Sequence, residues 1–287
     1  MAGPGLIVLV ECPRMFLSAS TEEERGEGSM TQALKLKGKV AIVTGAGGKP
    51  SSSGAFGTGK AIAALLAREG AKVAVVDRHQ DRAEETRRYI EDRGGEAMTV
   101  IANLCDEASC RAIVDQVVAR FGRLDILVNN AAVAVLKNLL ETTPQILSDS
   151  ITVNLVVPFM LSKAAVEVMI KNGGGAIVNI SSLAATRGGP MPAYSASKAG
   201  MDGMTLSIAT SYGKQGVRAN SIIVGAVDTP LRRHTVPGEY QPRVAALATE
   251  GDAWVIARAA LFLACDDSSH ITGVLLPVDG GASVMSA

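Results

Sequence analysis

Apolar residues recur along this chain as short continuous runs, separated by longer stretches of mixed character. Continuous runs, unlike alternating apolar and polar positions, are typical of strands buried on both faces of a parallel sheet. We predict seven such strands. They lie at residues 40–43, 72–76, 98–101, 125–128, 176–180, 217–223 and 274–276.

Helical stretches lie between the predicted strands. We expect helices at residues 59–69, 81–93, 107–121, 142–171, 192–213 and 252–265. The first three stop at Gly70, Gly94 and Gly122, because glycine readily adopts the left-handed conformation that ends a helix. The strand–helix alternation predicts an α/β fold: a doubly wound parallel sheet (Rossmann fold) with helices on both faces and right-handed crossovers.

The first 37 residues do not follow this pattern. The apolar run at residues 5–10 has no basic segment before it and is followed at once by Glu11, which argues against a secretory signal. Residues 22–29 are rich in Glu and Gly. We therefore predict a disordered N-terminal extension, residues 1–37, followed by one domain at residues 38–287.

Composition and charge exclude several classes of protein. The 287 residues include 28 basic and 28 acidic side chains, whereas a nucleic-acid binder needs an excess of Lys and Arg. No apolar run approaches the roughly 20 residues of a membrane span. The four cysteines form no CxxC pair or disulfide framework, which favours reduced thiols and a cytoplasmic protein. The three histidines show no metal-ligand spacing. We expect no nucleic-acid, membrane or metal partner.

Glycines follow the first predicted strand. Residues 44–48 read Thr-Gly-Ala-Gly-Gly, and a helix begins near Gly57, Thr58 and Gly59. Glycine lets backbone N–H groups approach a pyrophosphate at the positive N-terminus of a helix. Residues 54–60 also nearly match the P-loop of NTPases, but Ala61 lacks the hydroxyl that would bind Mg²⁺. We therefore favour a dinucleotide.

Asp77 ends the second predicted strand. A carboxylate there can accept both ribose hydroxyls of NAD and repel the 2′-phosphate of NADP. The alternative interpretation is an Asp that only caps the next helix. We favour the ribose role and NAD as the cofactor, with NADP less favoured, although Arg78 next door leaves some room for it.

Tyr194 and Lys198 are four residues apart on a predicted helix, so they share one face. A Lys ammonium near a phenol favours the phenolate and lowers the phenol pKa from its usual value of about 10. Ser181 and Ser182 close the preceding strand. Together these residues offer a hydroxyl donor, a tunable phenol and a cation.

With these motifs in order, the sequence resembles the short-chain dehydrogenase/reductase family over about residues 36–283. The matching segments are Thr44-Gly45, Gly57-Thr58-Gly59, Asn129-Asn130-Ala131, Asn154, Ser182, Tyr194 with Lys198, Gly225 to Thr229 and Leu275 to Gly281. The resemblance implies an oxidoreductase that transfers a hydride between NAD(H) and a secondary alcohol or carbonyl, acting as a homotetramer. The helices at 142–171 and 192–213 would pair across one interface.

The resemblance also implies a role for each site residue. Tyr194 would exchange the proton with the substrate oxygen, to which Ser182 would donate a hydrogen bond. Lys198 would hold the nicotinamide ribose, and Asn154 would anchor a water that relays protons to Lys198. The remaining cofactor contacts would be Asn103 and Leu104 beside the adenine, Asn130 and Ala131 on the cofactor floor, and Val227 and Thr229 at the carboxamide.

The sequence departs from the family pattern at two important places. Eleven residues, 46–56, separate Gly45 from Gly57 where the family has three, so residues 49–55 belong to an insertion of about eight. The family also has twelve residues between its catalytic Ser and Tyr. Ser181 fits that count, whereas the strand register counted from Gly175 favours Ser182 with one residue lost from the next loop. Adjacent strand residues face opposite sides, so only one can serve, and we favour Ser182. Milder changes are Ala132 and Val224.

Other features leave alternatives open. A substrate lid is expected at residues 230–252, where Arg232, Arg233 and His234 form either a solvated charged turn, which we favour, or a site for an acidic substrate. For Trp254 we favour packing on the sheet over closing the pocket.

A non-catalytic dinucleotide-binding or scaffold protein is the alternative function. A Ser-His-Asp hydrolase is excluded because no GxSxG motif occurs.

Overall fold

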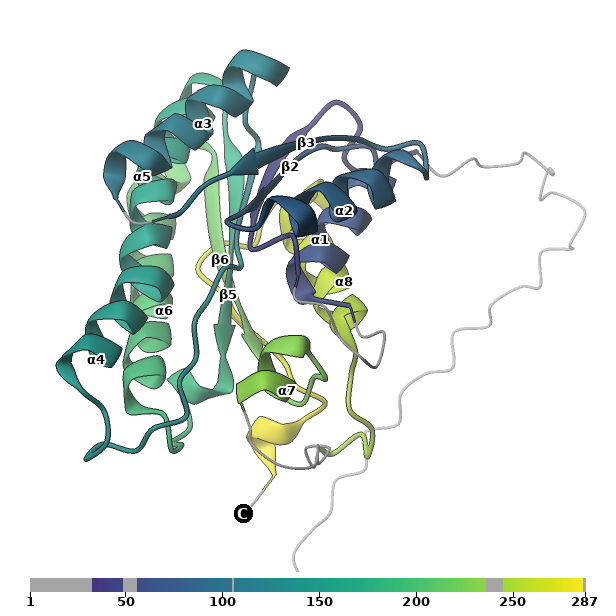
Figure 1. Cartoon of the computed structure of the whole chain (residues 1–287). Coiled ribbons are helices and arrows are strands. Elements are labelled where there is room, and N and C mark those ends of the chain that lie inside the picture. The colour runs from purple at the N-terminus through teal and green to yellow at the C-terminus, as the bar shows by residue number, and fades with distance from the viewer. Residues whose placement is uncertain (1–32, 49–55, 105, 236–244, 286–287) are drawn as a thin grey trace, which may run out of the picture. The chain divides into compact units, whose positions relative to one another are not determined.

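Seven parallel strands form one sheet in the order β3-β2-β1-β4-β5-β6-β7 (Figure 1). They are β1 (Val40–Thr44), β2 (Lys72–Asp77), β3 (Glu96–Ile101), β4 (Ile126–Asn129), β5 (Gly175–Ser182), β6 (Val217–Val224) and β7 (Leu275–Val278). All seven lie where the apolar runs predict them, with ends shifted by one or two residues. The doubly wound α/β fold is therefore confirmed.

The computed structural model describes residues 33–48, 56–104, 106–235 and 245–285. Most of the predicted N-terminal extension, the inserted residues 49–55 and residues 236–244 of the expected lid lie outside the described residues. Leu34–Ala287 forms one unit. Leu36 is buried, and its backbone N–H donates to the carbonyl of Glu69. The fold thus includes residues 34–37, which the sequence pattern assigned to the extension.

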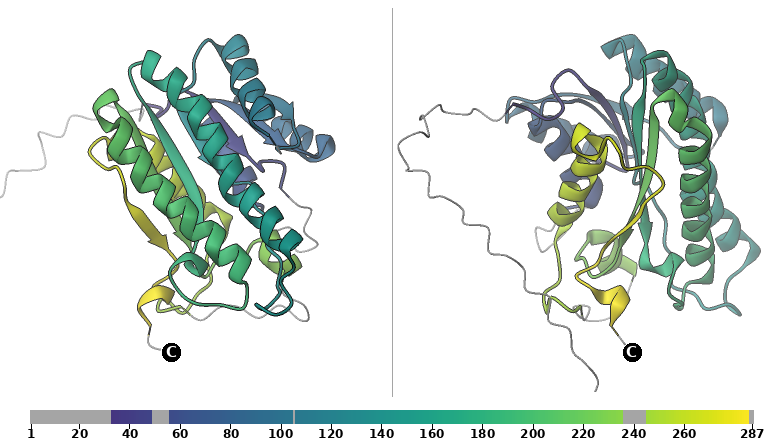
Figure 2. Two further views of the ribbon diagram at one scale, coloured as in Figure 1. Left: turned by 90° about the vertical axis from the view of Figure 1, so that its left-hand side faces the viewer. Right: turned by 180° about the vertical axis from the view of Figure 1, so that it is seen from behind.

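Helices cover both faces of the sheet (Figure 2). One face carries α1 (Thr58–Arg68), α2 (Gln80–Glu91) and α8 (Ala253–Ala264), and the other carries α3 (Glu107–Phe121), α5 (Val157–Lys171) and α6 (Pro192–Tyr212). The short helices α4 (Pro144–Ile151) and α7 (Pro230–Thr235) lie near the carboxyl ends of the strands. Short 3-10 turns occupy Leu183–Ala185, Gly213–Gln215, Asp266–Ser268 and Ala282–Val284.

Each central strand contributes to two separate hydrophobic cores. Val73 and Val75 of β2 pack with α1 and α8, whereas Ala74 and Val76 pack with α3 and α5. Successive strand residues point to opposite faces, and here both faces are covered. This explains why the strands are continuous apolar runs in the sequence.

The helix predicted at 142–171 is interrupted. It begins at Pro144, after Thr143 accepts a hydrogen bond from the Ile146 N–H, and residues Thr152–Val156 form a π-helical turn between α4 and α5. Such turns insert one residue into a helix and occur often at functional sites.

Pro144–Lys171 is long and apolar enough to cross a membrane by length and composition alone. Half of its most apolar window is buried inside the fold.

Candidate active site

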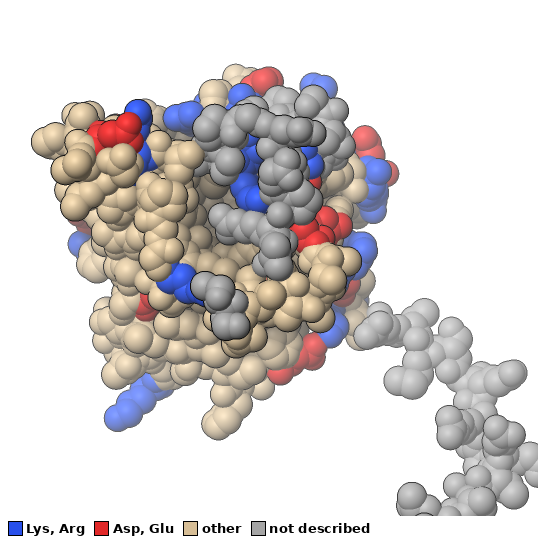
Figure 3. All heavy atoms as spheres, turned by 90° about the horizontal axis from the view of Figure 1, so that it is seen from below, with Lys and Arg blue, Asp and Glu red and all other residues tan. Residues whose placement is uncertain are grey.

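A cavity of about 880 Å³ opens at the carboxyl ends of the strands. Figure 3 views this end of the molecule, where the surface is hollowed and most of the visible lining is neither acidic nor basic. Ligands of open α/β sheets bind at this edge, and the volume lies in the usual range for small-molecule sites. The cavity contains all the predicted site residues except Asn154. They are Gly45, Gly57, Thr58, Gly59, Asp77, Asn103, Leu104, Asn130, Ala131, Ser182, Tyr194, Lys198, Val227 and Thr229.

The glycine segment, residues 44–48, packs tightly against the end of β4. Gly45 has φ +63°, and a Cβ there would lie 2.9 Å from the Ala131 Cα. A Cβ on Gly59 would lie 2.3 Å from the Gly45 carbonyl oxygen. The Asn130 amide donates to the Thr44 carbonyl at 2.8 Å. Only glycine fits at these two positions, which bring the end of β1 close to the N-terminus of α1 at the cavity.

Asp77 is oriented by two backbone donors. Its Oδ2 accepts from the Gly47 N–H and its Oδ1 from the His79 N–H, each at 3.0 Å. The residue at the N-cap of α2 is His79, whose side chain makes no capping bond. Asp77 therefore does not cap α2 in the usual way. Its carboxylate ties the glycine segment to the end of β2 and lines the cavity.

The two candidate serines face different surroundings. Ser182 is half-buried at the cavity, and its Oγ accepts from the Ala184 N–H at 3.2 Å. Ser181 is 2% exposed, and its hydroxyl has no hydrogen-bond partner among the described residues. The neighbouring Asn179, which shares a face of β5 with Ser181, bonds to Thr205 of α6. The Ser181 side chain is thus buried on the side of α6.

Tyr194 and Lys198 lie on one face of α6, as the spacing predicts. The Lys198 ammonium is 5.9 Å from the centre of the Tyr194 ring and donates to the Ile180 carbonyl at 2.7 Å. Lys198 is 1% exposed. Burial lowers its pKa to about 8, because the charged ammonium loses its hydration, while the nearby Asp202 carboxylate raises it.

Asn154 lies in the π-helical turn and does not line the cavity. Its amide bonds to both the N–H and the carbonyl of Val133, each at 2.9 Å, and donates to the Ser197 Oγ at 3.0 Å. These bonds tie the segment after β4 to the second turn of α6. The predicted water-anchoring role of Asn154 stays a prediction.

The described part of the lid carries two ion pairs. Arg232 pairs with Glu250, and Arg233 pairs with both carboxylate oxygens of Asp228. Thr229 precedes α7, and its Oγ1 accepts from the Arg232 N–H at 3.3 Å. Both arginines have carboxylate partners, Glu250 within the lid and Asp228 just before it. The Arg232 and Glu250 side chains are 15% and 9% exposed, so this pair is not the solvated turn favoured from the sequence.

Trp254 of α8 packs on Phe56, with ring centres 5.3 Å apart. Phe56 in turn meets Tyr89 edge-on at 5.4 Å. Trp254 therefore belongs to the core on the α1 and α8 side, as favoured from the sequence, and does not line the cavity.

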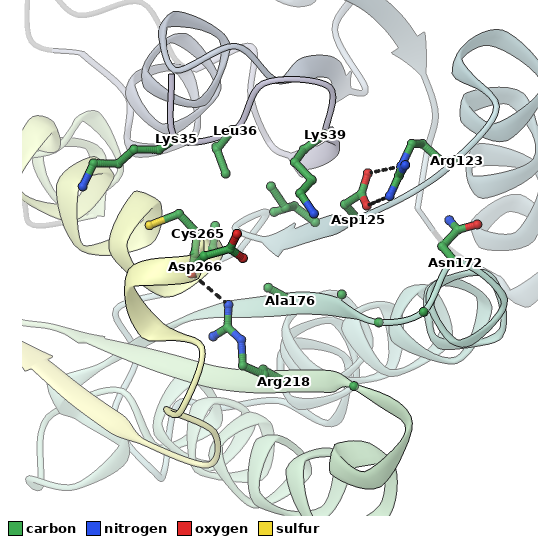
Figure 4. Close-up of a pocket in the computed structure, with 16 residues that line it drawn as sticks. Lys35, Leu36, Lys39, Arg123, Asp125, Asn172, Ala176, Arg218, Cys265 and Asp266 are labelled. Atoms are coloured by element: carbon green, nitrogen blue, oxygen red, sulfur yellow. Dashed lines mark hydrogen bonds and ion pairs between the residues drawn. The ribbon is translucent and has the colours of Figure 1, made fainter. Parts of the chain in front are cut away.

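A second, smaller cavity of about 200 Å³ lies at the opposite edge of the sheet (Figure 4). Its two arginines bind a carboxylate or main-chain carbonyls. Arg123 forms two bonds to Asp125, and Arg218 donates to the carbonyls of Leu263 and Cys265. These contacts join the amino ends of the strands to α8. In the described part of the chain, no cluster of three His, Cys, Asp or Glu could hold a metal at either edge.

Sequence reasoning missed a buried polar network behind Lys198. Asn129 donates to Asn179, Asn179 to Thr205 at 2.8 Å, and Thr205 shares a hydrogen bond with Ser221 at 2.9 Å. Asp202 lies beside this chain, 6% exposed. The sequence signal that could have indicated Asp202 is its position, four residues after Lys198 within a stretch that is otherwise small or apolar.

A doubly wound sheet, a glycine segment before its first helix and a Tyr–Lys pair in one cavity define a dinucleotide-dependent oxidoreductase. A family model described as enoyl-(acyl carrier protein) reductase matches residues 54–283. The chain belongs to the short-chain dehydrogenase/reductase family, whose members bind a nicotinamide dinucleotide and act on CH–OH groups.

Individual relatives agree with this assignment. The chain is 37% identical to an uncharacterized oxidoreductase of Thermotoga maritima, covering 88% of this chain and 100% of that protein. It is 37% identical to D-threitol dehydrogenase of Mycolicibacterium smegmatis, covering 88% and 95%. A solved 7α-hydroxysteroid dehydrogenase complexed with NADH and 7-oxo glycochenodeoxycholic acid superposes with TM-score 0.79 at 32% identity, covering 87% and 96%.

Proposed function

We propose that this oxidoreductase transfers a hydride between NAD(H) and a secondary alcohol or carbonyl, with Tyr194 as the general acid and base. The observation that carries the proposal is that Ser182, Tyr194, Lys198 and Asp77 line one cavity. The first three offer a hydroxyl, a phenol and an ammonium, and the fourth a carboxylate. A scaffold protein has no evident need for this combination.

The residues present suit a nicotinamide dinucleotide. The N-terminus of α1 presents backbone N–H groups where the close contacts of Gly45 and Gly59 leave no room for side chains. Asp77 lies at the end of β2, where a ribose would reach it. When bound, the cofactor supplies or accepts the hydride.

Residues of the protein itself transfer the proton and stabilise the charges that the transfer creates. In oxidation the Tyr194 phenolate takes the proton of the substrate hydroxyl, and in reduction the phenol returns it. The Ser182 hydroxyl donates a hydrogen bond to the same oxygen as negative charge develops there. The Lys198 ammonium stabilises the phenolate through its positive charge and holds the nicotinamide ribose.

We extend the proposal to a homotetramer. Phe159 of α5 and Leu206 of α6 are 56% and 45% exposed, so the two helices that we expect at one interface present apolar side chains outward. A mass four times that of the chain, measured by light scattering, would agree; a monomer would contradict it.

Changing Tyr194 to Phe removes the transferable proton but keeps the ring. We expect turnover to fall by about 10²–10⁴-fold while NADH binding, measured by fluorescence titration, changes little. Turnover is measured with a panel of secondary alcohols and ketones, through the absorbance of the reduced cofactor. Tyr212→Phe, near the far end of the same helix, is the matched control. Failure of the wild-type protein to bind NADH or NADPH would instead support the scaffold alternative.

Changing each serine to Ala separately tests which one acts. We expect Ser182→Ala to lower turnover by about 10²–10³-fold, because the developing oxyanion loses a donor. Ser181→Ala should keep most of the activity, since its hydroxyl is buried on the side of α6. Full activity of the Ser182 variant with loss in the Ser181 variant would reverse the assignment.

Asp77 tests the cofactor preference. We expect NADH to bind more tightly than NADPH, because the carboxylate repels the 2′-phosphate. Asp77→Asn should narrow the ratio of the two dissociation constants by about tenfold, equivalent to about 1.4 kcal/mol. Asp81→Asn, which removes a charge from the exposed first turn of α2, is the control. Tighter binding of NADPH by the wild-type protein would favour NADP and a role for Arg78.

A further inference from the structure

Asp202 is a buried acid for which the proposed reaction has no role. It lies on α6 one turn after Lys198, and the two side chains are 6% and 1% exposed. Both of its carboxylate oxygens lie out of solvent and have no hydrogen-bond partner among the described residues. Burying a carboxylate is costly unless an opposite charge or a hydrogen-bond donor compensates, so this arrangement requires an explanation.

The polar neighbours of Asp202 include two hydroxyls and one ammonium. The hydroxyls of Ser181 on β5 and Ser221 on β6 approach it from the sheet, and Lys198 is the charge on its own helix. Burial raises the pKa of Asp202, whereas the two hydroxyls and Lys198 lower it. Of these groups, only the Lys198 ammonium can balance a full negative charge.

The buried Lys198 ammonium likewise needs a compensating charge. Its ammonium donates to the Ile180 carbonyl and lies 3.9 Å from the Met201 sulfur, neither of which carries a charge. The Asp202 carboxylate is the acidic group that acts on it electrostatically, and it does so through space rather than through a hydrogen bond. Coulomb interactions are strong in such a water-poor interior.

We propose that Asp202 is a positioning residue that supplies the buried counter-charge of Lys198 and keeps its ammonium protonated beside Tyr194. Ser181 and Ser221 belong to the same arrangement, because their hydroxyls lie beside the ionised carboxylate. Asp202 does not line the cavity, so it acts through Lys198, which does. The catalytic meaning of this inference rests on the proposed function, but the electrostatic coupling does not.

The test is a titration of Lys198 in Asp202→Asn, which removes the charge and keeps the shape. Removing the carboxylate withdraws support for the ammonium, so the pKa of Lys198 should fall by about one unit or more from its wild-type value. The measurement is the pH dependence of the Lys198 side-chain Cε signal by carbon-13 NMR, identified by its absence from Lys198→Met. An unchanged pKa would overturn the inference.

Thr205→Val is the matched control. Thr205 is also buried and bonds to Asn179 and Ser221, but it carries no charge. Its loss should loosen the network without moving the pKa of Lys198 beyond a few tenths of a unit. A shift as large as that of Asp202→Asn would show that packing, not charge, is responsible, and would also overturn the inference.

A reciprocal measurement covers the case in which Asp202→Asn does not fold. In Lys198→Met the carboxylate loses its counter-charge, so the pKa of Asp202, measured from its carboxyl carbon, should rise above the wild-type value. Linkage requires the coupling to be the same in both directions. No rise would contradict the proposal.

The pH dependence of kcat provides a separate test. In an active enzyme, the high-pH limb of kcat should move to lower pH in Asp202→Asn, because Lys198 loses its proton sooner. A purely structural defect would lower kcat at every pH, which would contradict the proposal. The NMR titration needs no substrate or cofactor. A Lys198 shift in a protein that turns over no alcohol would therefore refute the proposed function and leave the coupling intact.

Discussion

The parallel direction of the seven strands is the constraint on which the whole site depends. Because every strand runs the same way, all the carboxyl ends meet at one edge, together with the N-terminal ends of the helices that follow. Gly45 follows β1, and Asp77 and Ser182 end β2 and β5. These three residues are far apart in the sequence, yet all line one cavity. The N-terminus of α1 at the same edge adds a positive dipole end that suits an anionic cofactor.

The same edge requires unusually close backbone approach. The contact of Gly59 with the Gly45 carbonyl fixes α1 against the turn that follows β1. Asp77 then holds the other side of that turn through the Gly47 N–H. Since a Cβ at Gly59 would collide with backbone, which has little freedom to move, the glycine positions are a packing requirement as well as a means of exposing N–H groups.

Behind the site, the rotation of α6 is set by polar groups rather than by apolar fit alone. A buried amide or hydroxyl is costly unless it is bonded, so Asn179, Thr205 and Ser221 permit few placements of this helix. Asn154, in the π-helical turn, adds a further restraint through Ser197. Tyr194 and Lys198 follow from that placement. Both line the cavity, and the Lys198 side chain is almost completely buried. A cation buried this completely makes Asp202 a functional candidate rather than a packing residue.

Features set by local interactions could be predicted from the sequence, whereas features set by contacts between distant segments could not. Strands, helices and the α/β class follow from local periodicity, and Tyr194 and Lys198 share a face because four residues make one helical turn. The π-helical turn around Asn154 was not predicted, because its bonds to Val133 and Ser197 form only after distant segments pack. Likewise, the local signal at Asp202, its spacing from Lys198 in a small and apolar stretch, does not show which groups it contacts. Its burial beside Lys198, Ser181 and Ser221 exists only once α6 lies on β5 and β6, and the removal of water there is what turns an ordinary carboxylate into a strong electrostatic partner.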